Sequence, residues 1–362
     1  MQKIKFPKST SGDFAHTIKT TAAKFSTRYN LLKMAKRELW LKFIFYSLLY
    51  ISLYIITLRI NWSNPLYFLF GYVMFSLTGI LLAFNASHDS AHQTFSNKKW
   101  VNNIIFRFTF NLQGVNSYLW KKRHIASHHL FPNVDGCDAD IDENVFLRLS
   151  PSHKARSFHK FQHIYATVLY MMYTLHWIFL KDLGYLTKKR LSNLKDIQHP
   201  KVEVFRFFLW KVVYLFFYLV LPIACGWSLK LVLISFFVSH FVISIFFVWT
   251  LIISHLTIET SFPVQDGDGV LPHDYYAHQL ATSMDYRPKN IIMNWVLGGF
   301  NAHAAHHLFP KYPHTMNRHM TAIIERNARK HQLQYHCKSF IGALFSHYAY
   351  LKKMGNGISI NC

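Results

Sequence analysis

Charged side chains are scarce in this chain of 362 residues, of which they make up 16%, against roughly 25% in soluble domains. Only 17 residues are acidic, whereas 40 are Lys or Arg. The four cysteines are scattered and form no CxxC pair. This excludes a disulfide-rich secreted scaffold and argues against thiolate zinc sites. The first 37 residues are basic and contain no early apolar run, so we expect no signal peptide.

Apolar residues, by contrast, make up 51% of the chain and aromatic residues 17%, which excludes intrinsic disorder. Four apolar stretches are long, at residues 41–58, 65–84, 205–225 and 231–254. A helix needs roughly 20 residues to cross the hydrocarbon core of a bilayer. The second and fourth stretches contain no charged residue at all, which buried helices of a soluble protein rarely achieve. The sequence therefore predicts four transmembrane helices.

The basic residues predict how these helices are oriented. The connections Arg59–Asn64 and Gly226–Lys230 close two hairpins and carry one base each, whereas residues 1–40, 85–203 and those after 254 carry nine, sixteen and ten. The positive-inside rule places both termini and the long middle segment in the cytoplasm. We therefore expect an all-α integral membrane protein of a bacterial inner membrane or the endoplasmic reticulum. Its four transmembrane helices form two hairpins, capped by a helical cytoplasmic domain.

The expected organisation is a basic cytoplasmic segment over residues 1–40 and a single membrane domain over 41–362, with cytoplasmic parts 85–203 and 255–362. Three further segments mix aromatic and polar residues and predict helices lying in the membrane interface: Val101–Trp120, Phe161–Leu180 and Asn290–Phe300. Lys and Arg next to a span attract anionic lipid headgroups, and no nucleic-acid-binding motif is present, so we expect a lipid bilayer and no nucleic acid as partner.

Eight of the 23 histidines form three clusters. The clusters are an HxxxH at His88 and His92, an HxxxHH at His124, His128 and His129, and an HxxHH at His303, His306 and His307. Spacings of three and four residues place side chains on one helix face. Neutral imidazole is the commonest metal ligand in proteins, and eight imidazoles exceed the six positions of one octahedral metal. Single HxxxH pairs arise by chance at surfaces, but three clusters on the predicted cytoplasmic side indicate two metal ions. Imidazole alone does not distinguish Zn, Cu, Fe and Ni.

Other polar residues near the clusters are candidates for weaker roles. His255, at the end of the fourth span, is a ninth candidate ligand, with an interfacial histidine as the plain alternative. We expect His278 to support the site or lie at the surface, and His240, within the fourth span, to be structural. Each of Asp89, Asp285 and Asn301 either orients an imidazole or belongs to a solvated loop. The acidic run at 135–143 is more typical of a solvated loop, although it can neutralise local positive charge.

The motifs around the clusters are similar to those of a known family. His88–His92 is followed by QTFSNKKW (93–100), residues 128–133 read HHLFPN, and a longer match runs from His278 and Gln279 to Pro313. Together they resemble the membrane fatty acid desaturases, of the linoleoyl-CoA or Δ5/Δ6 acyl-lipid type. The third cluster begins with His303, where the Δ5/Δ6 enzymes often have Gln.

The resemblance implies a di-iron centre that activates O₂ and removes two hydrogens from a fatty acyl chain, carried as acyl-CoA or acyl-lipid. An unactivated methylene has no acidic proton, so this reaction needs a redox metal such as iron and not zinc. The ligands carried over are the eight clustered histidines, and His255 matches a ninth in position. No HPGG motif of a fused cytochrome b5 domain is present. Electrons are therefore expected from a separate donor of the ferredoxin or cytochrome b5 type.

Two other functions fit parts of this pattern. Di-iron hydroxylases or ketolases of alkyl, acyl or carotenoid substrates share three histidine clusters, and the motif match at 278–313 favours the desaturase. A histidine-rich metal transporter needs polar ligands along a path through the bilayer, whereas these spans are nearly uncharged.

Overall fold

The computed structural model describes residues 4–9, 11–28, 30–59 and 64–357, and its chain divides into two compact units. Unit 1 comprises Met1–Lys36, Arg123–Ala166 and Trp249–Cys362, and unit 2 comprises Arg37–Lys122 and Thr167–Val248. Each unit thus draws on stretches that are distant in sequence. The predicted connection Arg59–Asn64 falls largely on residues 60–63, outside the described residues.

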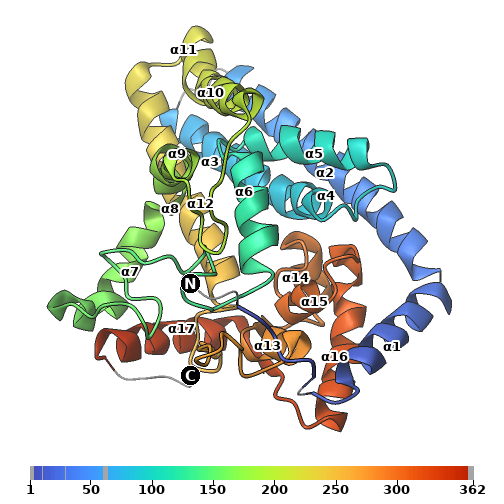
Figure 1. Ribbon diagram of the computed structural model, residues 1–362. Helices are drawn as coiled ribbons and strands as arrows, with labels where there is room; N and C mark the ends of the chain where they lie inside the picture. Colours follow the sequence, from blue (N-terminus) through green and yellow to red (C-terminus); the bar gives the residue numbers. More distant parts are fainter. Residues whose placement is uncertain (1–3, 10, 29, 60–63, 358–362) are drawn as a thin grey trace. The chain divides into compact units, whose positions relative to one another are not determined.

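Helices dominate both units (Figure 1). Unit 2 holds most of α2 (Leu31–Arg59), followed by α3 (Pro65–Leu82), η1 (Ala83–Ser87), α4 (His88–Ala91), α5 (Lys99–Asn111) and most of α6 (Ser117–Arg123). Its second stretch holds the second half of α7 (Gln162–Met171), whose first half belongs to unit 1, and then α8 (Tyr173–His176), η4 (Trp177–Lys181), α9 (Asp182–Thr187), α10 (Lys201–Leu215), η5 (Phe216–Val220), α11 (Leu221–Ala224) and most of α12 (Leu229–Ile252). Unit 1 holds α1 (Phe14–Arg28), η2 (His124–His128), η3 (Ser157–Phe161), α13 (Tyr275–Ala281), β1 (Met284–Tyr286), α14 (Ile291–Val296), α15 (His303–Leu308), η6 (His314–Met316), α16 (Asn317–Lys330), β2 (His336–Lys338) and α17 (Phe340–Gly355).

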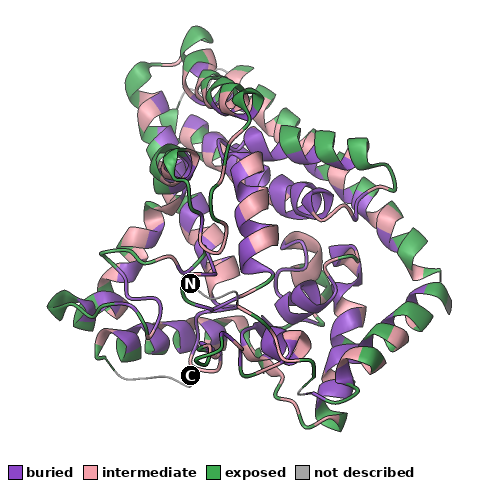
Figure 2. Cartoon of the chain, in the orientation of Figure 1, coloured by how far each residue is buried: buried purple, intermediate pink, exposed green. Residues whose placement is uncertain are grey.

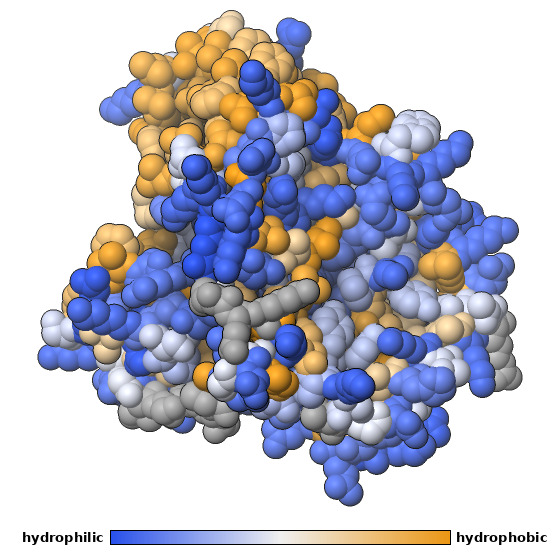
Figure 3. Space-filling model, viewed as in Figure 1, coloured by the Kyte–Doolittle hydropathy of each residue, from blue (hydrophilic) through white to orange (hydrophobic). Residues whose placement is uncertain are grey.

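Four helical segments are long and apolar enough to cross a membrane, as predicted: Leu31–Arg59, Pro65–Ala91, Lys201–Ala224 and Leu229–Ile252. The first begins ten residues before the predicted start, because residues 31–40 are mostly strong helix formers. The second continues past residue 84 through a π-helical turn into α4, so His88 lies on its extension. Hydrophobic side chains cover the surface over α11 and the adjoining part of α10 (Figure 3). The all-α membrane fold is thus confirmed, and the membrane side of each end stays a prediction.

Some buried polar groups of unit 2 pair with one another beside an aromatic core. Phe75, Trp120 and Tyr214 belong to one buried cluster. The Lys211 side chain, which interrupts the third span, forms an ion pair of 2.9 Å with Asp182. His240 lies 2.6 Å from the hydroxyl of Tyr214 through Nε2, and its Nδ1 lies 2.8 Å from the hydroxyl of Thr174. Polar groups inside a bilayer require such internal partners. These contacts agree with a structural role for His240.

In unit 1, α15 packs against α16. A buried cluster joins Ala304, Ala305 and Leu308 of α15 to Met320 and other apolar residues of α16, and α1 lies against α16 in the same cluster. The short strands β1 and β2 pair in parallel, with Asp285 opposite Cys337. This pairing, which the sequence does not predict, fixes β1 next to the start of α15.

An N-terminal segment also packs into unit 1. Lys5 forms a parallel bridge with Val270, and the ring of Phe6 stacks on Phe131 with centroids 5.4 Å apart. Phe6 also lies edge-on to His278, with centroids 5.3 Å apart. Phe131 directly follows the second histidine cluster, so the chain's first described residues support the loop that carries that cluster.

Candidate metal centre

Four histidine rings of unit 1 converge on one point. His128, His255, His303 and His307 each offer a ring nitrogen, and these four atoms all lie within 4.8 Å of one another. Nε2 of His255 is 2.7 Å from Nε2 of His303 and 3.1 Å from Nε2 of His307, and these last two are 3.1 Å apart. A proton bridges only two nitrogens, so three mutually close lone pairs repel one another. A metal cation among them removes this repulsion, and the donor set therefore fits a metal ion.

Acceptors behind two of these rings fix which nitrogen carries the proton. Nδ1 of His255 donates to the carbonyl oxygen of Thr282 over 2.8 Å. Nδ1 of His307 donates to Oε1 of Gln279, also over 2.8 Å, and the Gln279 amide nitrogen donates to the carbonyl oxygen of His129. With the proton on Nδ1, Nε2 of each ring presents its lone pair toward the cluster, as metal-binding histidines require.

A carboxylate holds the ring of His128. Nδ1 of His128 lies 3.1 Å from both carboxylate oxygens of Asp138, which is 1% exposed. Asp138 also accepts hydrogen bonds from the backbone N–H groups of Asn133 and Asp140. The Asn133 side chain in turn donates to the carbonyl oxygen of His255. One loop thereby positions both His128 and His255.

A second histidine group lies next to the first in unit 1. Nε2 of His129 is 3.0 Å from Nε2 of His124, and the rings of His129 and His306 have centroids 4.5 Å apart. Ring nitrogens of His124 and His306 lie within 4.8 Å of each other. All three side chains are buried. This group offers donors for a second metal ion.

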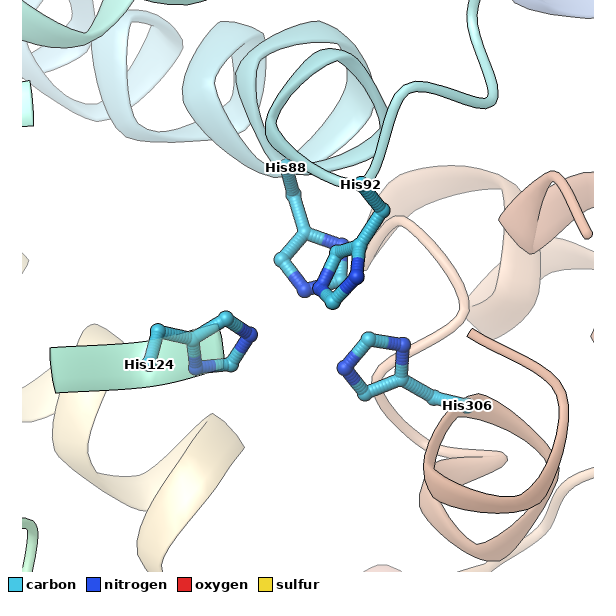
Figure 4. Close-up of side chains that lie close together, drawn as sticks. All are labelled: His88, His92, His124 and His306. Carbon is cyan, nitrogen blue, oxygen red and sulfur yellow. The ribbon is translucent and has the colours of Figure 1, made fainter. Parts of the chain in front are cut away.

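Unit 2 brings His88 and His92 together. The N–H of His92 donates to the carbonyl oxygen of His88, and the two rings have centroids 4.9 Å apart. Figure 4 shows these two rings projecting from one helical segment; it also shows the His124 and His306 rings of unit 1. The HxxxH spacing thus places both rings on one face, as predicted.

Burial favours the neutral form of three of these imidazoles. Burial lowers the pKa of His255 to about 3 and that of His92 to about 4. Burial and the neighbouring histidines lower the pKa of His307 well below its usual value. At His128, burial acts in the same direction, but the carboxylates of Asp138 and Asp140 outweigh it and raise the pKa. Neutral rings have a lone pair available for a metal.

Comparison with known proteins identifies the family. The family model described as "Fatty acid desaturase" matches residues 60–339. The chain belongs to the fatty acid desaturase family. It is 30% identical over 289 residues to the sn-1 linoleoyl-lipid 6-desaturase of Arthrospira platensis, covering 79% of this chain and 77% of that one. It is 27% identical to the enzyme of the same name from Synechocystis sp., covering 79% and 80%.

A third relative has a longer chain. The acyl-lipid (8-3)-desaturase of Physcomitrium patens is 31% identical over 275 residues, covering 74% of this chain and 56% of that one. The family resemblance predicted from the motifs is thereby confirmed, and the chain is a fatty acid desaturase, hence an oxidoreductase.

The structure places the nine predicted ligands of the desaturase in the groups just described: His88 and His92 in unit 2, and His124, His128, His129, His255, His303, His306 and His307 in unit 1. His255 joins His303 and His307 directly. His278, in contrast, is buried outside these groups, where its Nε2 donates to the carbonyl oxygen of Pro132 over 3.1 Å. This position agrees with a supporting role for His278.

Asp89, Asp285 and Asn301, each a candidate either for orienting an imidazole or for a solvated loop, are all buried. Asp285 is buried and accepts hydrogen bonds from the N–H of Ala304, over 2.8 Å, and from the hydroxyl of Tyr335, over 2.6 Å. It holds the first turn of α15, and burial raises the pKa of its carboxyl to about 7. Asn301 donates to the carbonyl oxygen of Arg287. The Asp89 carboxylate accepts from the Thr94 hydroxyl, which fixes the turn after His88.

Sequence reasoning missed the groups that orient the rings. Asp138 lies within the acidic run that we interpreted as a solvated loop, and that interpretation is wrong for Asp138 because His128 and two backbone N–H groups hold it in the interior. Gln279 is part of the matched motif, but its contact with His307 joins residues that are 28 positions apart in the sequence. The sequence signal that could have indicated Asp138 is its position only ten residues after His128, a predicted ligand.

Proposed function

We propose that this family member is an O₂-dependent di-iron desaturase that introduces a double bond into a fatty acyl chain. Two hydrogens leave adjacent carbons of the chain, and O₂ takes them up together with two electrons and two protons to give two molecules of water. The convergence of His128, His255, His303 and His307 is the observation that carries this proposal. A metal site built from histidines, with no thiolate, is compatible with iron, and the removal of hydrogen from an unactivated methylene requires a redox metal.

The proposed ligand set consists of His88, His92, His124, His128, His129, His255, His303, His306 and His307. Two irons bound there would supply the oxidising power that removes hydrogen from an unactivated methylene. The chain's own part is to fix the rings and keep water away. Asp138, Gln279 and the carbonyl oxygen of Thr282 hold three rings by Nδ1. The burial of all seven unit 1 histidines limits access of bulk water.

We propose a fatty acyl lipid or acyl-CoA as the substrate, because the relatives include lipid-linked desaturases. Burying each methylene of an acyl chain contributes about 0.8 kcal/mol, so an apolar protein can hold such a chain without polar contacts. A separate ferredoxin or cytochrome b5 would supply the electrons. Both termini and the metal centre are proposed to face the cytoplasm, following the distribution of Lys and Arg.

The test compares fatty acids in a host expressing the wild-type chain or His307→Ala, together with a ferredoxin or cytochrome b5 system. Gas chromatography–mass spectrometry should detect a new unsaturated fatty acid only with the wild type, and its fragmentation gives the bond position. Metal analysis of the purified proteins should show two irons in the wild type and fewer in the variant.

His176→Ala serves as the control, because His176 is exposed and lies outside the histidine groups. It should retain both activity and iron. A new hydroxylated or ketonic lipid in place of an alkene would assign the chain to the di-iron oxygenases instead. Full activity and normal iron in His307→Ala would show that the ligand set is wrong.

A further inference from the structure

One face of unit 1 is basic and free of exposed large hydrophobic side chains. It is formed by α1 and α16, which pack side by side over a shared apolar cluster (Figure 1). The turns of these helices that point away from the cluster are exposed (Figure 2). They carry five exposed bases: Lys19, Lys24, Arg326, Arg329 and Lys330. Blue, hydrophilic side chains dominate the surface over α16 (Figure 3).

Acidic residues barely offset this charge. Asp13 precedes α1, and Glu325 on α16 forms an ion pair of 2.5 Å with Lys289. The remaining outward charges on both helices are positive. The face therefore attracts an anionic partner, and it does so over more than one turn of each helix.

The lack of apolar side chains separates this face from membrane-facing surfaces. Among the described residues of α1 and α16, no large hydrophobic side chain is exposed. Two other helices of unit 1 differ: α17 exposes Ile341 and Phe345, and α14 exposes Ile291 and Ile292. A helix that lies in a bilayer interface presents apolar residues to the acyl region, and α14 and α17 have such exposed residues. The α1–α16 face instead suits a partner in water.

Helix α16 of this face packs directly against α15, the helix that carries the third histidine cluster. Met320, Ile323 and Ile324 of α16 pack against Ala304 and Leu308 of α15 without an intervening element. Helices in direct contact have axes about 8–10 Å apart. Because α15 carries His303, His306 and His307, a protein docked on α16 lies one helix away from three of the proposed iron ligands. Electron transfer between proteins requires such short separations.

We propose that the outer face of α1 and α16 is the docking surface for an acidic, water-soluble redox protein that delivers electrons to the metal centre. The inference rests on the proposed function, because only a metal centre that consumes electrons needs such a partner. The bases on α1 and α16 would guide the partner by long-range attraction, and the absence of apolar contacts would allow rapid release after electron transfer.

The experiment measures binding separately from catalysis. Purified wild type in nanodiscs of zwitterionic lipid is titrated with oxidised [2Fe–2S] ferredoxin and with a soluble cytochrome b5 domain, at low and at high salt. The test variant reverses two charges near the end of α16, Arg326→Glu with Arg329→Glu. The matched control reverses two exposed bases in the last turn of α17, Lys352→Glu with Lys353→Glu.

At least one of the two probes should bind the wild type, more weakly at high salt. The α16 variant should raise the Kd for that probe at least about tenfold at low salt, and the α17 control should leave it within about twofold. Iron content should be the same in all three proteins. Ferredoxin- or cytochrome-driven desaturation should fall in the α16 variant, whereas desaturation driven by dithionite should not change.

Three outcomes overturn the docking surface. The first is that neither probe binds the wild type, and the second is that the wild type and the α16 variant bind the probe equally. The third comes from a parallel titration with anionic vesicles, in which the α16 variant would lose vesicle binding but keep probe binding. The last result would assign the face to a lipid surface. A wild type that forms no alkene even with dithionite would contradict the proposed function instead, and the binding data would still decide the docking surface.

Discussion

Gln279 and His307, 28 residues apart in the chain, are joined by a hydrogen bond of 2.8 Å between the amide oxygen and Nδ1 of the ring. The bond fixes the ring so that Nε2 faces His255 and His303. Because Gln279 also donates to the carbonyl oxygen of His129, one amide connects α15 to the second histidine cluster. Gln279 therefore fixes the geometry of the candidate metal centre.

Gln279→Leu should weaken metal binding, because Leu has about the same size but offers no acceptor to His307. Loss of such a supporting contact typically lowers metal affinity by about 10–100-fold. Iron per protein, measured after dialysis against a chelator, should fall well below the wild-type value. Gln279→Glu keeps an acceptor at this position and should retain more iron than the Leu variant. Equal iron in the Leu variant and the wild type would contradict the positioning role.

The neighbouring carboxylates Asp138 and Asp140 provide a matched comparison. Asp138 is buried and holds His128 at 3.1 Å, whereas the side chain of Asp140 is 38% exposed and lies 3.6 Å from the same ring. Asp138→Asn should lower iron content and activity about tenfold or more. Asp140→Asn should leave both within about twofold, since an exposed ion pair contributes little. If the two variants lose iron equally, the loop as a whole and not the Asp138 contact supports the site.

Gly355 ends α17 where this helix packs on η3. A Cβ at this position would collide with the carbonyl oxygen of His159, a backbone atom that cannot move alone. Gly355→Ala should therefore destabilise the protein by about 1–3 kcal/mol, as other overpacking substitutions do. Gly184→Ala in α9 is the control, because a Cβ there meets nothing within 4 Å. Thermal unfolding in detergent should show a lower Tm only for Gly355→Ala.

Two natural cysteines test the predicted topology. Cys225 is exposed at the turn between α11 and α12, and Cys337 is exposed on β2 of unit 1. In a Cys362→Ser background, a membrane-impermeant maleimide added to intact cells or sealed spheroplasts should label Cys225 and not Cys337. Inverted membrane vesicles should give the reverse pattern. Burial raises the pKa of the Cys337 thiol to about 11, which slows its reaction, so each signal is compared with the same cysteine in detergent. Labelling of both cysteines from one side would refute the proposed orientation.

Local sequence patterns predicted the spans and the pairing of His88 with His92. Apolar length alone located four helices, and the spacing of His88 and His92 placed their rings on one helix face. Both features depend on residues within a few turns of each other. The early start of α2 was missed because the prediction followed hydropathy, whereas residues 31–40 are helical by intrinsic preference.

The contacts that hold the rings could not be predicted from such patterns. Asp285 reaches Tyr335, 50 residues later, only because β1 and β2 pair. Phe6 stacks on Phe131, more than a hundred residues away. Three-residue strands carry too little periodic signal to be recognised in a sequence. The identity of the ligands was thus accessible from spacing, while their orientation depends on tertiary contacts.

The composition of unit 1 from three separated stretches has a consequence for biosynthesis. His128 and His255 meet His303 and His307 only after the ribosome has passed the last of these four residues, 179 positions after His128. Lys5 of the N-terminal segment likewise pairs with Val270 only after the chain between them has been made. A nascent chain therefore inserts its spans while its histidines are still apart. With the proposed ligand set, metal would be delivered to a protein that is already in the membrane, and a shortage of metal at this stage would leave inserted chains without it.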